Sequence, residues 1–556
     1  MNLIIHLKKE HSNKVLFTFF LIFLFIGLIT YKDYGIHIEE KFYRLNGFYW
    51  LNYVLNFTEF NDLKNLTSIK LNEISGFTLA NVTVWNKYGI IFDVPTAFLE
   101  IILNIDESRI YYQFRHLISF LLFFLSSIFF YKLLLNRFSN FNVSFIGTIF
   151  YVLSPRIYGD SFYNNRDILF LSFVTFALYY LFKTIDKLSY KNLIFFSIFS
   201  AICTSTRIIG IFLPISFIII YLLSILAKKD GLKFFPRIIF YFLFFFVFLL
   251  IHWPYLWSAP IDNFFSVFQF VKTGLIEMKI LFNGEYVSNR FLPYSYIPTW
   301  IAISTPVIHL FFFLLGYYYI TKRFFLRFLT IKEISIYYDF WRGKNEKKDF
   351  FIFFNISVII LLLISMNATL YGAWRHIYFL NIFIVYISTY SFYIIYINLK
   401  SYNRKFQFSL LIVSLLLLVL LKMITYHPYQ GIYFNSFVPN HYKNKFETDF
   451  LGISGVKFLK DILILEKNKS TINVGVAAFL PIERSLELLN KNESKRIKII
   501  GQEYKYADYI FKNNISEVDR NINNKYNIPN NFIKIDEFVI DGVLLYEIYK
   551  NTEKIK

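Results

Sequence analysis

Cysteine and charged residues are scarce in this sequence. Of its 556 residues only Cys203 is a cysteine, so an intrachain disulfide cannot form and a metal site built from cysteines is excluded. Charged residues make up 17% of the chain, whereas hydrophobic residues make up 56% and aromatic residues 22%. This composition excludes intrinsic disorder, a collagen-like chain and a disulfide scaffold. It is typical of a polytopic α-helical membrane protein.

Motifs of several enzyme and transporter classes are absent as well. The chain has no glycine-rich nucleotide loop, and its histidines do not show the spacing of zinc ligands. No internal repeat recurs at a fixed period. An inverted-repeat transporter would need matching halves with broken helices, and a proton-coupled one would place acids within its spans, where this sequence has almost none.

Basic residues outnumber acidic ones by 58 to 38, which gives a net charge of +20. They lie mainly between the apolar segments, where the positive-inside rule accounts for them without a nucleic-acid partner. Every second loop is basic, so about eleven spans with a cytoplasmic N-terminus and an outer C-terminus are consistent with the charges. The predicted spans are residues 14–31, 116–135, 141–153, 168–182, 192–208, 211–226, 238–252, 297–320, 351–367, 377–399 and 408–423.

The predicted transmembrane domain, residues 1–425, contains two long outer loops. The first loop, residues 32–111, includes the apolar segment Ile90–Leu103, which is too short to cross a hydrocarbon core of about 30 Å and is expected to lie along the interface. The second loop, residues 253–298, is rich in aromatic residues. An aromatic belt at the membrane surface explains it, and so does a lid or groove for a lipid-linked sugar.

The composition changes after Met423, where the chain becomes polar and has no further apolar run of span length. The expected strands are Thr471–Ala478, Ile497–Ile500 and Phe538–Tyr549, and the expected helix is Val456–Leu465. Residues 426–556 are therefore predicted to form a small α/β domain on the outer side of the membrane.

Charged residues gather on the predicted outer face at membrane level, where burying a charge is costly. The acids are Asp33, Glu39, Glu40 and Asp167, and the basic residues are Arg156, Arg166, Arg207, Arg375 and His376. A carboxylate can take the proton from a hydroxyl, and guanidinium groups bind phosphate oxygens in pairs, so the pattern favours transfer from a lipid phosphate. Ion pairs in a solvated loop, a carboxylate at a helix N-terminus and an interfacial anchor beside Trp374 are the structural alternatives.

The order and sidedness of these features resemble the GT-C glycosyltransferases, in particular the protein O-mannosyltransferase and aminoarabinose transferase group. In that family an Asp-Glu pair follows the first span, with an aromatic residue and often an arginine soon after it. The matching pair here is Glu39-Glu40, with Tyr43 and Arg44 after it. Two further features resemble the group, namely Asp167 at the start of a span and the Arg375-His376 turn. The resemblance covers residues 14–425 and does not extend to the C-terminal region.

The resemblance implies an inverting transfer of a sugar from a polyprenyl-phosphate-linked donor to an acceptor hydroxyl on the extracytoplasmic face. The first acid of the family's pair is the base, which implies Glu39; because glutamate is one methylene longer than aspartate, Glu40 and Asp33 are alternatives. The residues implied to hold the donor phosphate are Arg375, His376, Arg156, Arg166 and Arg207, and Asp167 is a second acid. Some members are metal-independent and others bind a divalent metal ion near these acids; Asp167 and Glu40 alone supply too few hard ligands to establish such a site. The expected location is the inner membrane of a bacterium.

Three other functions are alternatives to this one. A flippase or exporter of lipid-linked glycans would line a continuous cavity with charges, and an oligosaccharide ligase usually has its large outer loop late in the chain. A scaffold with a sensory outer domain would not need acids and arginines gathered at membrane level. The sequence does not specify the sugar, the acceptor, which can be a protein, a lipid or a glycan, or the role of the C-terminal region.

Overall fold

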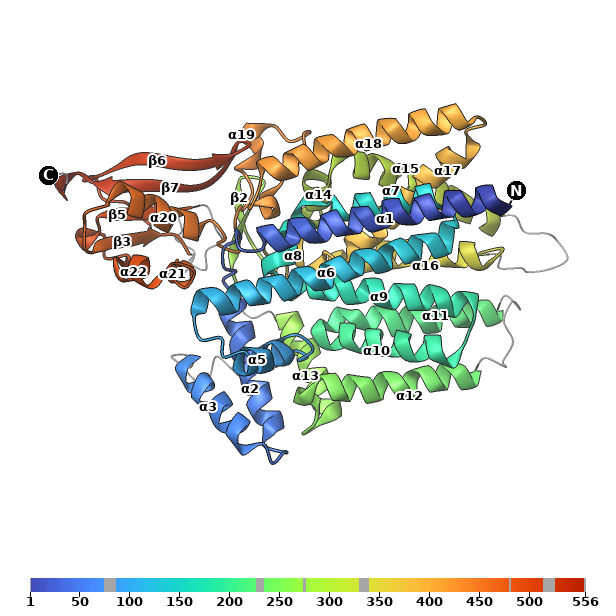
Figure 1. Cartoon of the computed structure of the whole chain (residues 1–556), viewed down its shortest axis with the longest axis horizontal. Coiled ribbons are helices and arrows are strands. Elements are labelled where there is room, and N and C mark those ends of the chain that lie inside the picture. Colours follow the sequence, from blue (N-terminus) through green and yellow to red (C-terminus); the bar gives the residue numbers. More distant parts are fainter. Residues whose placement is uncertain are drawn as a thin grey trace.

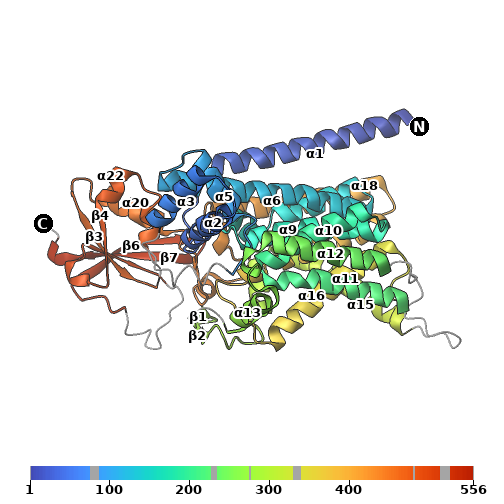
Figure 2. The same cartoon turned by 90° about the horizontal axis from the view of Figure 1, so that it is seen from below.

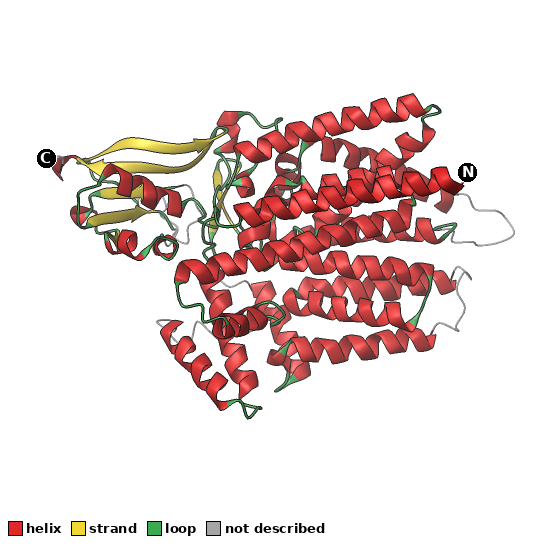
Figure 3. Cartoon of the chain, viewed as in Figure 1, coloured by secondary structure: helices red, strands yellow, loops and turns green. Residues whose placement is uncertain are grey.

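The computed structural model of the chain describes residues 2–74, 87–226, 235–273, 277–329, 340–479, 482–513 and 526–554. A bundle of long helices carries a group of shorter helices at one end, next to a C-terminal region that contains a sheet (Figure 1). The N-terminus lies at the opposite end of the bundle, and the turned view in Figure 2 shows the same separation. Colouring by secondary structure shows that the bundle itself is entirely helical (Figure 3).

Eight helices in the described part of the chain are long and apolar enough to cross a membrane. They are α1 (Asn2–Thr30), α6 (Ser108–Phe138), α9 (Asp167–Asp186), η1 with α11 (Ile208–Ile211 and Phe212–Leu226), α12 (Phe235–His252), α16 (Lys344–Ser365), α17 (Leu380–Asn398) and α18 (Tyr402–Thr425). The apolar parts of α9 and α17 are 78% buried, whereas those of α1 and α12 are only 17% buried. The exposed apolar side chains of the outer helices would face lipid, as expected of an integral membrane protein.

The predicted number of eleven spans is not confirmed. The helix α7 (Phe141–Val152) has 12 residues and α10 (Tyr190–Thr206) has 17. At about 1.5 Å per residue, a helix as short as α7 does not reach across a core of about 30 Å. Both helices nevertheless pack inside the bundle, α7 on α6 and α17, and α10 on α9 and α12.

The predicted span 297–320 is broken into two helices, α14 (Tyr296–Ser304) and α15 (Val307–Phe328). Pro306 separates them, because proline has no backbone N–H to donate and disfavours a helical conformation in the residue before it. The broken element still packs along α17.

The short elements at the end of the bundle opposite the N-terminus (Figure 1) come from the two predicted long loops, except α8 (Pro155–Tyr163), which lies between the predicted spans 141–153 and 168–182. They are α2 (Glu40–Leu55), α3 (Asn61–Ile74), α5 (Asp93–Ile102), α8 (Pro155–Tyr163), η3 (Pro254–Leu256), α13 (Pro260–Thr273) and the antiparallel strands β1 (Lys279–Phe282) and β2 (Glu285–Ser288). The apolar segment Ile90–Leu103 contains α5, which buries Ala97 and Ile101 against Leu45 and Phe48 of α2. Residues 75–86 of the first loop lie outside the described part of the chain.

The region after α18 contains a sheet with strand order β4-β3-β5-β7-β6, in which β3 is parallel to β4 and β5 while β7 is antiparallel to β5 and β6. Its elements are η5 (Gln430–Ile432), α19 (Asn440–Lys443), α20 (Gly455–Leu465), β3 (Ile472–Ala477), α21 (Glu483–Leu486), α22 (Lys491–Lys495), β4 (Ile497–Gly501), η6 (Tyr504–Tyr506), β5 (Tyr509–Lys512), β6 (Phe532–Ile540), β7 (Val543–Asn551) and η7 (Thr552–Lys554). The predicted helix and the first two predicted strands are confirmed as α20, β3 and β4.

The third predicted strand, Phe538–Tyr549, is wrong because the chain reverses within it. Asp541 and Gly542 both have positive φ, 49° and 78°, and form the two-residue turn between β6 and β7. An Asp-Gly pair is a typical hairpin turn, since both central residues must adopt this conformation.

This C-terminal region is bonded to the helix bundle at several points. The carboxylate of Asp541 accepts hydrogen bonds from Lys422 Nζ (2.8 Å), Tyr426 (2.9 Å) and Lys443 Nζ (3.1 Å). Glu487, which directly follows α21, accepts a hydrogen bond of 3.0 Å from Tyr112 of α6. The sheet region is therefore held against the same end of the bundle as the short helices.

Candidate active site

The segment between α1 and α2 runs beneath the C-terminal region and carries the first acids. A Cβ on Gly35 would lie 2.2 Å from the carbonyl oxygen of Ile453, so only glycine fits at this crossing. The N–H of Ile38 donates to the carbonyl oxygen of Leu451 at 3.1 Å, and the N–H of Glu39 donates to Nδ1 of His37 at 2.9 Å. These contacts fix the backbone immediately before α2.

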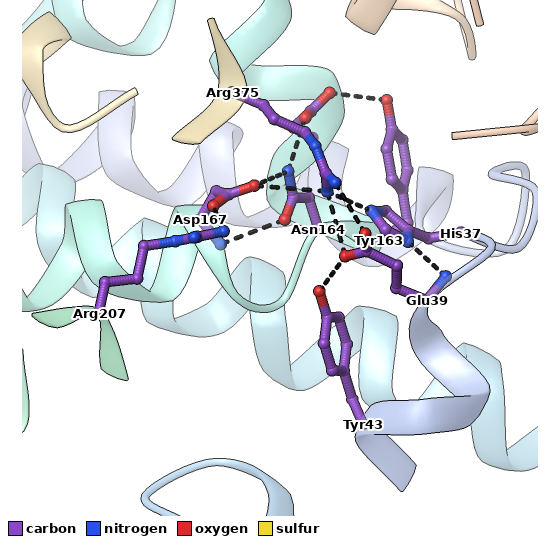
Figure 4. Close-up of polar contacts among 9 residues, drawn as sticks. His37, Glu39, Tyr43, Tyr163, Asn164, Asp167, Arg207 and Arg375 are labelled. Atoms are coloured by element: carbon purple, nitrogen blue, oxygen red, sulfur yellow. Dashed lines mark hydrogen bonds and ion pairs between the residues drawn. The ribbon is translucent and has the colours of Figure 1, made fainter. Parts of the chain in front are cut away.

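The carboxylate of Glu39 is buried and held by a bidentate ion pair (Figure 4). Arg375 Nη2 lies 2.7 Å from Oε1 and Nη1 lies 3.2 Å from Oε2, and the hydroxyl of Tyr43 also donates to Oε2. Burial alone would raise the pKa of Glu39, but the charge of Arg375 and these hydrogen bonds lower it well below its usual value. While these contacts hold, Glu39 is ionised and is a weak base, because its pKa is low.

Arg375 also reaches the second predicted acid, Asp167, which is the first residue of α9. Arg375 Nη1 lies 3.8 Å from Asp167 Oδ2, and Arg207 forms an ion pair with Oδ1 of the same carboxylate (Figure 4). Asn164 Nδ2 donates to Asp167 Oδ2 at 3.0 Å. A carboxylate is favoured at a helix N-terminus, where it offsets the macrodipole. The structure thus joins Glu39, Arg375, Asp167 and Arg207 into one chain of contacts.

The turn that presents Arg375 is unusual in its backbone. Gly372 and Ala373 have φ of 65° and 60°, and the N–H of Ala373 donates to Glu447 Oε1 at 3.0 Å. The guanidinium carbon of Arg375, in η4 (Arg375–Ile377), lies 5.3 Å from the ring centre of Phe450. Residues of the C-terminal region therefore help to position the arginine of the site.

The two other acids predicted as bases have different partners. Both carboxylate oxygens of Glu40 lie 3.1 Å from Nε2 of His116, and Oε1 accepts the N–H of His37 at 2.7 Å. Asp33 is 48% exposed and lies 2.9 Å from Nε2 of His427. Glu40 therefore fixes the backbone before Glu39 rather than facing Arg375, and Asp33 lies at the surface.

Two of the other predicted phosphate-binding residues also have partners of their own. Arg166 Nη2 lies 3.1 Å from Asp93 Oδ2, and its guanidinium carbon is 4.5 Å from the ring centre of Tyr43. His376 packs edge-to-face on Tyr371; burial and the charge of Arg375 lower the pKa of His376 well below its usual value, so it is a neutral side chain.

Arg156 and Arg375 both line a cavity of about 40 Å³ between α8, η5, the turn that presents Arg375 and residues 447–453. Its Nε donates to the carbonyl oxygen of Tyr433 at 3.0 Å. Asp160 of α8 lines the same cavity, and burial raises its pKa to about 6. A larger apolar cavity of about 680 Å³ lies between α1, α7 and α18.

Sequence reasoning missed several members of these sites. Asn164 and Asp160 belong to the same polar segment as Asp167, and their spacing of three and four residues was a usable signal of a shared cluster. His37 and Glu447 carried no such signal, because their roles depend on contacts across the fold. Within the described residues, no three His, Cys, Asp or Glu side chains come together as a metal-binding group.

These features define an integral membrane protein with a buried carboxylate–arginine site at one end of its helices. The family model described as dolichyl-phosphate-mannose-protein mannosyltransferase matches residues 94–257, which confirms the expected resemblance over that stretch. The match includes Arg156, Arg166, Asp167 and Arg207, whereas Glu39 and Arg375 lie outside it. No curated protein matches the chain. The family match supports a glycosyltransferase of the GT-C type, similar to mannosyltransferases.

Proposed function

We propose that the protein transfers a sugar from a polyprenyl-phosphate-linked donor to an acceptor hydroxyl, with inversion at the anomeric carbon. The observation that carries this proposal is the contact chain in which Arg375 joins Glu39 to Asp167 while Arg207 pairs with Asp167. One carboxylate that can act as a base and two guanidinium groups that can neutralise a leaving phosphate are the groups that this reaction requires.

Arg207 is the cation that an incoming phosphate reaches first. Its side chain is 17% exposed, compared with 1% for Arg375, and its Nε has no hydrogen-bond partner among the residues that the structure describes. A phosphate placed between Arg207 and Arg375 would accept hydrogen bonds from both guanidinium groups. The apolar cavity between α1, α7 and α18 supports a substrate with a lipid chain.

Donor binding activates Glu39 by taking over its partner. The phosphate competes for Nη1 and Nη2 of Arg375, which now hold the carboxylate at 3.2 and 2.7 Å. Once Arg375 turns to the phosphate, Glu39 keeps its hydrogen bond from Tyr43 and its pKa rises toward the usual value of a glutamate. The carboxylate then takes the proton of the acceptor hydroxyl, whose oxygen attacks the anomeric carbon opposite the phosphate. The bond from that carbon to the phosphate oxygen breaks, and polyprenyl phosphate leaves.

The reaction is assigned to the extracytoplasmic face. The short helices and the C-terminal region that surround the site lie at the end of the bundle opposite the N-terminus (Figures 1 and 2). The basic loops favour a cytoplasmic N-terminus, which supports a site on the extracytoplasmic face.

The test is release of labelled polyprenyl phosphate in proteoliposomes that contain polyprenyl-phosphate sugars and candidate acceptors. We expect turnover by the wild type, loss of turnover in Glu39→Gln, and no change in Glu10→Gln, a matched substitution at the far end of α1. Turnover that Glu39→Gln leaves intact would contradict the assigned base. If no donor is consumed and labelled lipid crosses the bilayer instead, the protein is a flippase.

A further inference from the structure

We propose that the 40 Å³ cavity beside Arg375 binds a polar substituent of the transferred sugar, so that the C-terminal region helps to select the sugar. This inference rests on the proposed function, because it assumes that the reacting centre lies at Glu39 and Arg375. The cavity is lined by Arg156, Asp160, Arg375, Glu447, Asp449 and Phe450, among others. Arg375 thus contacts the reacting carboxylate of Glu39 and also lines the cavity.

The unmet hydrogen-bonding groups around this cavity are donors. Arg156 and Arg375 are 5% and 1% exposed, and Nη2 of Arg156 and Nε of Arg375 have no partner among the described residues. A Cβ on Gly372, another lining residue, would lie 2.9 Å from this Nε, so the atom lies next to the wall of the cavity. Buried donors without a partner are costly, so a ligand that supplies acceptor oxygens is favoured here.

The carboxylates around the cavity, in contrast, already accept hydrogen bonds from the protein. Asp160 accepts from Tyr163 at 2.8 Å and from Asn164 at 3.0 Å. Asp449 accepts two backbone N–H groups, those of Ile453 and Ser454, both at 2.9 Å. Their positions are thus fixed before any ligand enters, and each oxygen retains a further lone pair.

The charge balance identifies the kind of ligand. Three carboxylates and two guanidinium groups line the cavity, which disfavours a phosphate. Although burial raises the pKa of both Asp160 and Asp449 to about 6, they are mostly ionised at neutral pH. A hydroxyl suits this mixture, because it accepts from an arginine and donates to a carboxylate at the same time.

The size of the cavity narrows the ligand further. A single water molecule needs a cavity volume of roughly 10–15 Å³. A cavity of about 40 Å³ therefore holds about three water-sized groups. A sugar ring does not fit, whereas the exocyclic hydroxymethyl group of a hexose does. The cavity is therefore expected to favour hexoses over pentoses, which lack this group.

Two substitutions test the cavity directly. Arg156→Met removes the unpartnered donor while keeping an apolar stem of similar length. Gly431→Ala narrows the cavity, because the added Cβ would lie 2.4 Å from the Tyr163 hydroxyl and 2.8 Å from Asp160 Oδ1. The matched controls are Arg290→Met, at a 40% exposed side chain, and Gly343→Ala, where a Cβ meets nothing within 4 Å.

The experiment measures kcat/KM of the full-length protein in proteoliposomes for pairs of polyprenyl-phosphate sugars that differ only in the hydroxymethyl group. The pairs are mannose with lyxose, glucose with xylose and galactose with L-arabinose. We expect the wild type to prefer the hexose of the pair that it uses. Arg156→Met and Gly431→Ala should lower kcat/KM for that hexose roughly 10- to 100-fold and change the pentose value little, because the first removes a hydrogen bond from a charged group and the second fills the space that the hydroxymethyl group needs.

The affinity for polyprenyl phosphate without a sugar serves as the internal control and should be unchanged in Gly431→Ala, and thermal unfolding reports that both variants are folded. Equal losses for hexose and pentose, or a wild type without preference between them, would overturn the inference while leaving the proposed function intact. Failure of the wild type to turn over any of the donors would overturn the proposed function as well.

Discussion

Replacing Glu39 with glutamine is expected to tighten the binding of polyprenyl phosphate while it abolishes sugar transfer. Glutamine has nearly the same shape as glutamate but carries no charge, so the bidentate ion pair with Arg375, at 2.7 and 3.2 Å, is lost. In the wild type the phosphate must displace this carboxylate before it can use Nη1 and Nη2 of Arg375. The variant removes the competitor and leaves the cation in place.

The magnitude follows from the strength of the displaced contact. A hydrogen bond to a charged group contributes about 1.5–3 kcal/mol, and this pair is buried and therefore little screened by salt. If removal of the Glu39 charge returns most of this free energy to phosphate binding, the affinity for phosphate rises roughly 10- to 100-fold, because about 1.4 kcal/mol corresponds to a tenfold change. Loss of the base lowers the transfer rate by about 10²- to 10⁴-fold.

The assay is equilibrium binding of a short-chain polyprenyl phosphate to the purified protein in lipid nanodiscs, followed by calorimetry. Glu10→Gln provides the matched control, and thermal unfolding confirms that both variants are folded. Unchanged or weaker binding to a folded Glu39→Gln variant would refute the reasoning, because it would show that the carboxylate and the phosphate do not share Arg375. The same result together with normal turnover would also remove Glu39 from the reaction.

Three further predictions concern binding, pH and docking. Arg207→Ala should weaken polyprenyl phosphate binding roughly 10- to 100-fold through loss of a charge-assisted contact, whereas Arg290→Ala should not, as calorimetry would show. The fold lowers the pKa of Glu39 below its usual 4.5, so the ionised carboxylate stabilises the folded protein above pH 4.5. This stabilisation is lost as the pH falls through the pKa of Glu39 in the folded protein. The melting temperatures of wild type and Glu39→Gln should therefore converge on acidification. Asp541→Asn should lower the melting temperature by weakening the contacts with Lys422 and Lys443, at a cost of about 1 kcal/mol since the site is partly exposed, while Asp536→Asn at the exposed strand β6 serves as its comparison.

Local sequence patterns predicted much of the secondary structure. Long apolar runs marked the eight helices that are long enough to cross a membrane, and the helix at α20 and two strands of the sheet were found from their periodicity. The errors have local causes as well. Pro306 divides a mainly apolar run, and the Asp541-Gly542 turn divides a segment whose flanking residues favour strands.

The candidate site was predicted in part. The sequence identified acids and arginines at the ends of the spans, and the structure joins Glu39, Asp167, Arg207 and Arg375 by direct contacts. It could not rank Glu39 against Glu40, because adjacent residues at the start of a helix point in different directions. The structure directs Glu40 to His116, which lies 76 residues further along the chain.

The sequence by itself determined that this is a helical membrane protein in which acids and arginines lie at the ends of the spans. The local sequence is enough for this conclusion, because a charged residue is costly within an apolar segment that crosses the membrane. Only the tertiary structure decided which charges meet. Glu39 and Arg375 are separated by 336 residues, and the packing of α2, α8 and α9 with the turn before α17 brings them together under residues 446–453. Ion pairs of this kind are selected by the whole fold, since a buried charge is tolerated only where the fold supplies its partner.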